Sequence, residues 1–224
     1  MLHFFGRLLL SAFFCLLVGA CSTRTAGMAG TVNSLLYGPG DVSATMPLNP
    51  SLRYLRVVAS GGVSLMVLGY IDAHPAGPIN VWYSSNGEVL KIQNGHVVGL
   101  TGGSAQWRHV SFTDMPQWQP NQASKLLFTR TRDVMPGYLF NVTDQLELRK
   151  VAAPARSNLA GAQALQLAQR LQWFEAHDLA GQLPPARYAV QSQGSLQTVV
   201  YSEQCLSQAF CISWQSWPPT ALAP

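Results

Sequence analysis

Two Asn-Gly pairs, Asn86-Gly87 and Asn94-Gly95, constrain the fold of this chain more than any other feature of its sequence. Asn-Gly tolerates the positive φ angles that both central positions of a type I′ hairpin turn require. The residues on either side of each pair are β-branched, aromatic or otherwise typical of strands. The sequence therefore predicts a three-stranded antiparallel meander over residues 81–100.

Type I′ turns at these pairs also predict which residues face each other. Around the first turn, Val81 should pair with Ile92 and Tyr83 with Leu90. Around the second, Ile92 should pair with Val97 and Leu90 with Gly99. This register gives the meander one apolar face, and it places the following side chains on the opposite face: Trp82, Lys91 and Val98.

Further strand patterns occur along most of the chain. Residues 53–59 and 63–71 are expected to form a hairpin around Ser60-Gly61-Gly62. The other predicted strands are Arg108–Thr113, Lys125–Arg130, Tyr138–Val142, Gln145–Arg149, Tyr188–Ser192, Leu196–Ser202 and Phe210–Trp214. Many short strands separated by turns are typical of a sandwich or barrel. The predicted fold class is therefore mainly β, an antiparallel meander closing into a barrel or sandwich with at most one or two short helices.

Two segments are candidates for those helices. Val32–Tyr37 is expected to form a short helix before the Gly38-Pro39-Gly40 break. Ala160–His177 is ambiguous, because its Ala, Gln, Leu and Arg content favours a helix. Its apolar residues also recur with the period of two that is typical of a strand.

The N-terminus is typical of an export signal. After Arg7, residues 8–20 are apolar or small, a run shorter than the about 20 residues that a membrane-spanning helix needs. The run ends in Val18-Gly19-Ala20-Cys21, which resembles the lipobox of bacterial lipoproteins, with Val18 where Leu is usual. This resemblance implies cleavage after Ala20 and lipidation of Cys21 by acyl chains such as palmitate. We therefore divide the chain into a signal peptide (1–20), a flexible tether (21–30) and one β-rich domain (31–224).

Cys205 and Cys211 are the cysteines that remain in the predicted domain. Two cysteines in an exported domain predict a disulfide, because the compartment is oxidising. Their spacing would place the bond across a turn between two strands. A redox or metal-binding pair is the alternative, although the sequence has no CxxC motif and no His at ligand spacing.

Composition and motifs argue against several classes of function. Basic residues exceed acidic ones by only 14 to 10 and are scattered, which does not favour nucleic-acid binding. The common nucleophile-elbow, phosphate-loop, zinc-protease and dinucleotide motifs do not occur. We expect no catalytic residue, no metal and no cofactor. A glycan hydrolase would need two neighbouring carboxylates, for which the sequence offers Asp72, Glu88, Asp114, Asp133, Asp144, Glu147 and Glu175.

The chain contains six tryptophans, and most of them are expected in a β core. Trp107 and Trp118 are the candidate exceptions, because they lie in the polar stretch 102–124. Exposed indole rings there could stack on sugar faces.

Two segments, Tyr54–Asp72 and Val81–Gly102, resemble the YjbF family of lipoproteins, which includes a lipoprotein associated with group 4 capsule production. The resemblance continues more weakly through Ala186–Pro218. It implies a mainly β, barrel-like fold and a role in exopolysaccharide or capsule production or export. It also implies that Ala160–His177 is largely a strand. The cysteine pair departs from the family pattern, and no active-site residue can be transferred.

Together these observations predict an outer-membrane lipoprotein that faces the periplasm and has no catalytic activity. Its expected partners are the membrane, through the lipid anchor, and polysaccharide or proteins of the export machinery. One alternative is a periplasmic β-barrel that carries lipids or lipoproteins, which would need an apolar, unfilled interior. The other is a glycan hydrolase.

Overall fold

The structure is a computed structural model in which residues 41, 43, 45–119, 125–161 and 164–219 are described. They belong to one compact unit, Asp41–Pro224. The predicted signal peptide, cleavage site at Ala20, lipidated Cys21, tether and helix at Val32–Tyr37 all lie outside the described residues.

The described residues form twelve strands and one helix. In chain order these are β1 (Tyr54–Ala59), β2 (Gly62–Asp72), β3 (Ile79–Tyr83), β4 (Val89–Gln93), β5 (His96–Thr101), β6 (Gln106–Thr113), β7 (Lys125–Met135), β8 (Leu139–Val151), α3 (Ala164–Arg170), β9 (Gln172–Asp178), β10 (Ala186–Gln193), β11 (Leu196–Cys205) and β12 (Cys211–Trp217).

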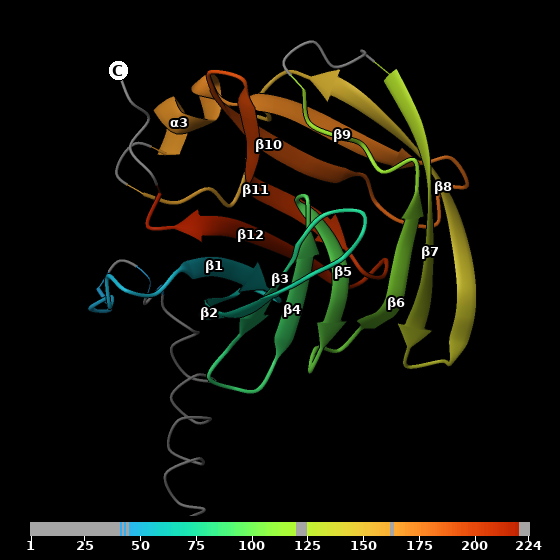
Figure 1. Cartoon of the computed structure of the whole chain (residues 1–224), viewed down its shortest axis with the longest axis horizontal. Helices are drawn as coiled ribbons and strands as arrows, with labels where there is room; N and C mark the ends of the chain where they lie inside the picture. Colours follow the sequence, from blue (N-terminus) through green and yellow to red (C-terminus); the bar gives the residue numbers. More distant parts are fainter. Residues whose placement is uncertain (1–40, 42, 44, 120–124, 162–163, 220–224) are drawn as a thin grey trace, which may run out of the picture. The chain divides into compact units, whose positions relative to one another are not determined.

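Each strand pairs antiparallel with the next along the chain, and β1 pairs with both β2 and β12 to close a barrel (Figure 1). Closure pairs the first strand with the last, so neither is left as an edge, and the weakest seam is that between β5 and β6, which pair only at Leu100 and Trp107. The predicted mainly β meander is confirmed, and the barrel is the form it takes. No helix among the described residues is long and apolar enough to cross a bilayer.

The register predicted around the first Asn-Gly pair is wrong by one residue. Tyr83 pairs with Val89 and Trp82 with Leu90. Gly87, but not Asn86, has a positive φ, and its N–H bonds the carbonyl of Ser84. The pair thus forms the end of a longer turn that Ser84 starts, in place of the centre of a type I′ turn. Because a one-residue shift exchanges the two faces of a strand, Trp82 enters the core.

The second Asn-Gly pair forms the predicted tight turn. Asn94 and Gly95 have φ angles of 47° and 84°, and Ile92 pairs with Val97 as expected. A bulge between Lys91 and Ile92 then shifts the register, so Leu90 pairs with Leu100 and not with Gly99. Bulges of this kind bend a strand, which barrel closure requires.

Ala160–His177 combines both structures that the sequence suggested. Its first half contains α3 and its second half contains β9. The expectation that the segment is largely a strand is therefore only half correct. The two strands predicted over 138–142 and 145–149 are one continuous strand, β8.

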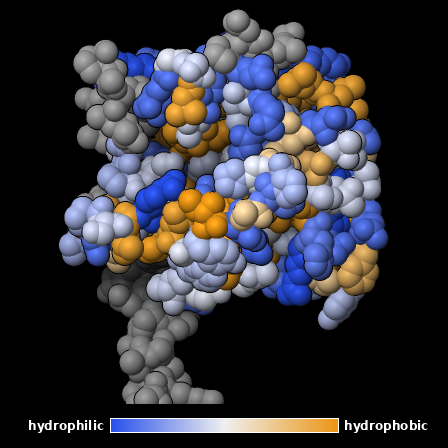
Figure 2. Space-filling model, in the orientation of Figure 1, coloured by the Kyte–Doolittle hydropathy of each residue, from blue (hydrophilic) through white to orange (hydrophobic). Residues whose placement is uncertain are grey.

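Side chains from all around the barrel fill its interior. The apolar core includes Trp82, Leu90, Phe128, Phe174 and Trp214. Gln204, buried on β11, crosses to β5, where it donates to the carbonyl of Gly95 and accepts the N–H of Val97, both at 3.0 Å. Outside the barrel, a smaller cluster forms between α3 and strands β9 to β11, and it contains Ala168, Trp173 and Tyr201. On the face seen in Figure 2, apolar surface shows over β1 and β2.

The predicted disulfide between Cys205 and Cys211 is confirmed. The two cysteines are cross-strand partners at the end of β11 and the start of β12. The bond therefore closes the turn between these strands.

Candidate functional site

A pocket of about 340 Å³ opens at one mouth of the barrel. Its walls come from segments that are far apart in the sequence: the start of β1, strands β3, β4 and β12, the loop between β2 and β3, and the β4–β5 and β10–β11 hairpins. Barrel closure alone brings these segments together, because β1 pairs with β12.

Two buried tryptophans line the pocket. Trp82 is 5% exposed and Trp214 is 3% exposed, and both line the pocket together with Leu55, Ile92 and Val199. Neither indole N–H has a hydrogen-bond partner among the described residues. Both nitrogen atoms are buried away from solvent, and a buried donor without a partner costs about 1–3 kcal/mol.

Amide side chains surround this aromatic wall. Four of them line the pocket: Asn80, Asn94, Gln117 and Gln197. Each offers both donors and acceptors, which are the complements of sugar hydroxyl groups. An apolar aromatic wall with a few convergent polar groups is the usual composition of a small-molecule site.

Hydrogen bonds fix the two loops that border the pocket. Nε2 of Gln93 lies 3.0 Å from Nδ1 of His74 and donates to the carbonyl of Gly77 at 2.7 Å. Nδ2 of Asn94 donates to the carbonyl of Pro116 at 2.7 Å. These contacts hold residues 74–77 and 115–118 against the β4–β5 turn. The loop between β2 and β3 can be followed in Figure 1, where it passes in front of β4 and β5.

Gly95 explains how closely the mouth is packed. Its φ is positive, and a Cβ at this position would come within 2.5 Å of the Val199 side chain. Glycine thus allows the β4–β5 turn to touch β11 across the mouth, and both contacting residues line the pocket.

The pocket contains no acidic group. None of the chain's ten acidic residues, all of which lie at position 41 or beyond, lines it. Among the described residues that do, Arg53 alone carries a charge. The arrangement offers an apolar wall and hydrogen-bonding groups to a polar ligand, but it does not offer the carboxylate pair that acid–base glycoside cleavage needs.

Trp107 and Trp118, predicted as exposed stacking surfaces, are both buried, so that expectation is corrected. Trp107 is 1% exposed, and its N–H donates to the carbonyl of Leu206 at 2.9 Å. Trp118 is 8% exposed and donates to the carbonyl of Asn94 at 2.8 Å. The polar composition around them was misleading, because both indoles pack in the core cluster in spite of their polar neighbours in the chain.

Sequence reasoning missed Arg53, Trp82 and Trp214. Trp82 was placed on the wrong face by the register error. No sequence signal connects Arg53, on the edge of β1, with Trp214 on the last strand, because only closure of the barrel makes them neighbours.

A charged cluster lies inside the barrel beside Trp107. Oδ2 of Asp144 accepts hydrogen bonds from Nε of Arg130 at 2.8 Å and from Nε of Arg132 at 2.7 Å. All three side chains are about 95% buried. Both guanidinium groups also lie over the Trp107 ring, at 4.3 and 4.9 Å from its centroid. Burial opposes ionisation of Asp144, but the two arginines outweigh it and lower its pKa.

His96 lies in the same interior, surrounded by aromatic rings. Its Nδ1 is 3.0 Å from the hydroxyl of Tyr188, and it stacks on Trp118 with a centroid distance of 5.8 Å. Burial, assisted by the charge of Arg130, lowers the pKa of His96 to about 3. The imidazole is therefore neutral at physiological pH.

Most carboxylates considered for hydrolysis have other partners. Asp133 pairs with His109, Glu147 with Lys125 and Arg149, and Glu175 with Arg187 and His177. In the part of the chain that the structure describes, no group of three or more His, Cys, Asp or Glu is placed to bind a metal ion.

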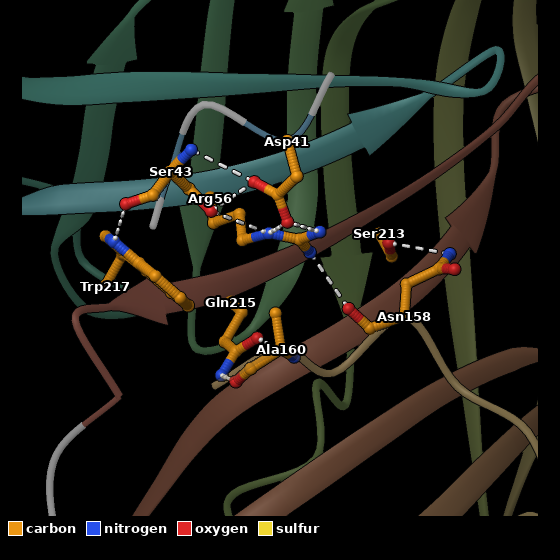
Figure 3. A network of polar contacts seen from close by, with 8 residues as sticks. All are labelled: Asp41, Ser43, Arg56, Asn158, Ala160, Ser213, Gln215 and Trp217. Atoms are coloured by element: carbon orange, nitrogen blue, oxygen red, sulfur yellow. Dashed lines mark hydrogen bonds and ion pairs between the residues drawn. The ribbon is translucent and has the colours of Figure 1, made fainter. Parts of the chain in front are cut away.

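A polar network ties the first described residues to the outer face of the barrel (Figure 3). Arg56 on β1 donates to Oδ2 of Asp41 at 2.7 Å and to the carbonyl of Asn158 at 2.9 Å. Trp217 donates through Nε1 to the carbonyl of Ser43 at 3.1 Å. The hydrogen bond from Arg56 lowers the pKa of Asp41. The network thus fixes the point at which the chain joins the barrel.

We expect Asp41→Asn to weaken this attachment by about 1 kcal/mol or less, because the carboxylate is partly exposed and solvent screens the pair. Amide hydrogen exchange should become faster at Ser43 and at residues 45–49 and remain unchanged in β7 and β8. Asp72→Asn, an exposed carboxylate without an ion pair in the described chain, is the matched control. Equal exchange in both variants would show that the ion pair does not hold this segment.

Comparisons with known proteins identify a fold and no family. No protein-family model and no curated protein sequence match the chain. Among solved structures, the chain is similar to the hypothetical lipoprotein YmcC from Escherichia coli, with a TM-score of 0.55 and 15% sequence identity. The alignment covers 90% of this chain and 98% of that one. The barrel is therefore a known fold, and a solved protein that shares it is described as a lipoprotein.

Proposed function

We propose that this protein is an outer-membrane lipoprotein that faces the periplasm and assists exopolysaccharide or capsule production or export without catalysing a reaction. In this role the pocket at the barrel mouth binds saccharide units of the polymer. The lipid at Cys21 would hold the barrel at the membrane, where the polymer is exported.

The mouth pocket carries this proposal. Sugars present C–H groups that pack on apolar walls and hydroxyl groups that exchange hydrogen bonds with amides. The pocket combines Trp82 and Trp214 with four amide side chains, and it has no carboxylate. Binding without cleavage is the chemistry that these residues can perform.

Lipid anchoring is supported by two further observations. The sequence ending at Cys21 resembles a lipobox, and the protein with a similar fold is described as a hypothetical lipoprotein. Several buried acyl chains would attach the protein stably, since each buried CH₂ contributes about 0.8 kcal/mol.

The interior of the barrel does not support the lipid-carrier alternative. Trp107, Phe128 and the Arg130–Arg132–Asp144 cluster occupy the space that an acyl chain would need. Placing a lipid there would require the displacement of buried charges, which is costly.

Gene deletion tests the proposed role. We expect the deletion strain to lose surface polysaccharide or to misplace it, as measured by quantifying polysaccharide on cells and in the medium. Complementation with the intact protein should restore it, whereas Cys21→Ala should not. Unchanged polysaccharide across several growth conditions would contradict the proposal.

A second prediction concerns the pocket itself. Asn80→Ala combined with Gln197→Ala should weaken binding to the strain's purified exopolysaccharide about tenfold, because each lost hydrogen bond contributes about 0.5–1.5 kcal/mol. Calorimetry on the purified soluble domain would measure this. The matched control, Gln145→Ala combined with Gln166→Ala, removes two exposed amides outside the pocket and should bind normally. Equal affinity for the two double variants would exclude the pocket as the saccharide site.

A further inference from the structure

We propose that the mouth pocket selects an acidic saccharide unit, whose anionic substituent is bound by Arg53. This inference rests on the proposed function, because it assumes that the ligand is a saccharide. It adds the charge of the ligand and the residue that recognises it.

Arg53 is a free cation at the rim of the pocket. Its side chain has no carboxylate within ion-pair distance among the described residues and no hydrogen bond there. Its guanidinium carbon lies 6.0 Å from the centroid of the Trp82 ring. By contrast, the arginines at 56, 130, 132, 149 and 187 all pair with carboxylates. All five N–H donors of Arg53 are therefore available to a ligand.

The rest of the pocket lacks any group that would repel an anion or compete for Arg53. All ten acidic residues lie elsewhere. The lining thus has one positive charge and no negative charge, which an anionic ligand would complement.

Arg53 also lies where a bound sugar would place a substituent. The guanidinium carbon lies 6.0 Å from the centroid of the Trp82 ring, so Arg53 borders the apolar wall that a bound sugar would contact. A guanidinium forms strong bidentate hydrogen bonds with carboxylate or phosphate, and contact with an aromatic wall strengthens them because it excludes water. The volume of about 340 Å³ is in the range of small-molecule sites. A free inorganic anion would leave the aromatic wall unused.

The test uses oligosaccharides released from the strain's own exopolysaccharide, in three forms. The first is native, the second has its carboxyl groups reduced to alcohols, and the third is dephosphorylated with hydrofluoric acid. Each form is titrated against the purified soluble domain and against Arg53→Gln, Arg53→Lys and the matched control Arg108→Gln, an exposed arginine on β6 outside the pocket.

We expect the native form to bind at least tenfold more tightly than one of the two neutralised forms, with affinity that falls as salt increases. Arg53→Gln should abolish the difference, Arg53→Lys should retain part of it, and Arg108→Gln should retain all of it. The neutralised form that loses binding identifies the anion as carboxylate or phosphate. Equal binding of all three forms, with no effect of Arg53→Gln, would overturn this inference and leave the proposed saccharide site intact. Failure of every form to bind the unmodified domain would overturn the saccharide site itself.

Discussion

Replacing Asp144 with Asn is expected to lower the free energy of unfolding by about 3–5 kcal/mol, the cost of leaving buried charges without a counter-charge. Arg130 and Arg132 are each 5% exposed, and Asp144 is their shared anionic partner. The amide keeps the shape of the side chain, so the decrease in the free energy of unfolding reports the removed charge and not a change in packing. Urea denaturation followed by tryptophan fluorescence would report it.

Two further variants define what this loss means. Asp133→Asn removes a carboxylate that pairs with the exposed His109, and it should change stability far less. A triple variant, Arg130→Met with Arg132→Met and Asp144→Leu, should recover most of the stability lost in Asp144→Asn, because an apolar replacement leaves no unpaired charge. Wild-type stability of Asp144→Asn would mean that water reaches the arginines.

The stability of the barrel is expected to fall by about 2 kcal/mol between pH 6.5 and pH 4.5 because of His96 alone. The folded state holds this imidazole neutral, with a pKa of about 3 against 6.5 for the free side chain. Below pH 6.5 the unfolded chain binds a proton that the folded chain does not bind. Acidification therefore favours unfolding until the pH approaches the folded-state pKa.

His96→Asn should flatten this part of the pH profile. Asparagine retains an acceptor for the Tyr188 hydroxyl but does not titrate, so the variant should be less stable at pH 7 and lose less on acidification. Urea unfolding at intervals of half a pH unit would measure both profiles. His109→Asn, at a site where the imidazole is 85% exposed, should leave the slope unchanged. Parallel profiles for His96→Asn and wild type would assign the pH dependence to other groups.

Lowering the pH further should protonate Asp144 and remove its contribution to stability. Its folded-state pKa is depressed, so its contribution to stability is present above the pKa of the unfolded chain and is lost as the pH falls through the folded value. Stability is thus lost over two successive pH ranges as the pH falls, first because of His96 and then because of Asp144.

Local sequence patterns predicted the strands and the main turns. Positions 60–61 and 94–95 turn as expected, and Cys205 bonds to Cys211 across a strand end. These features depend on residues that are adjacent in the chain or directly opposite across one turn. Register was predicted less well, because Ser84 hydrogen-bonds the backbone of Asn86 and Glu88 and lengthens the first Asn-Gly turn. That error alone placed Trp82 on the wrong face of its strand.

The sequence by itself determined that the chain forms antiparallel β structure, with one disulfide and an N-terminus that resembles a lipoprotein signal. Only the tertiary structure decided where the candidate site lies. Arg53, Trp82, Gln197 and Trp214 belong to different hairpins and have no relation in the sequence, and closure of β1 on β12 makes them one pocket. The tertiary structure also decided that Trp107 and Trp118 are buried, because an indole enters the core when the segment that carries it turns inward, whatever the polarity of its neighbours in the chain.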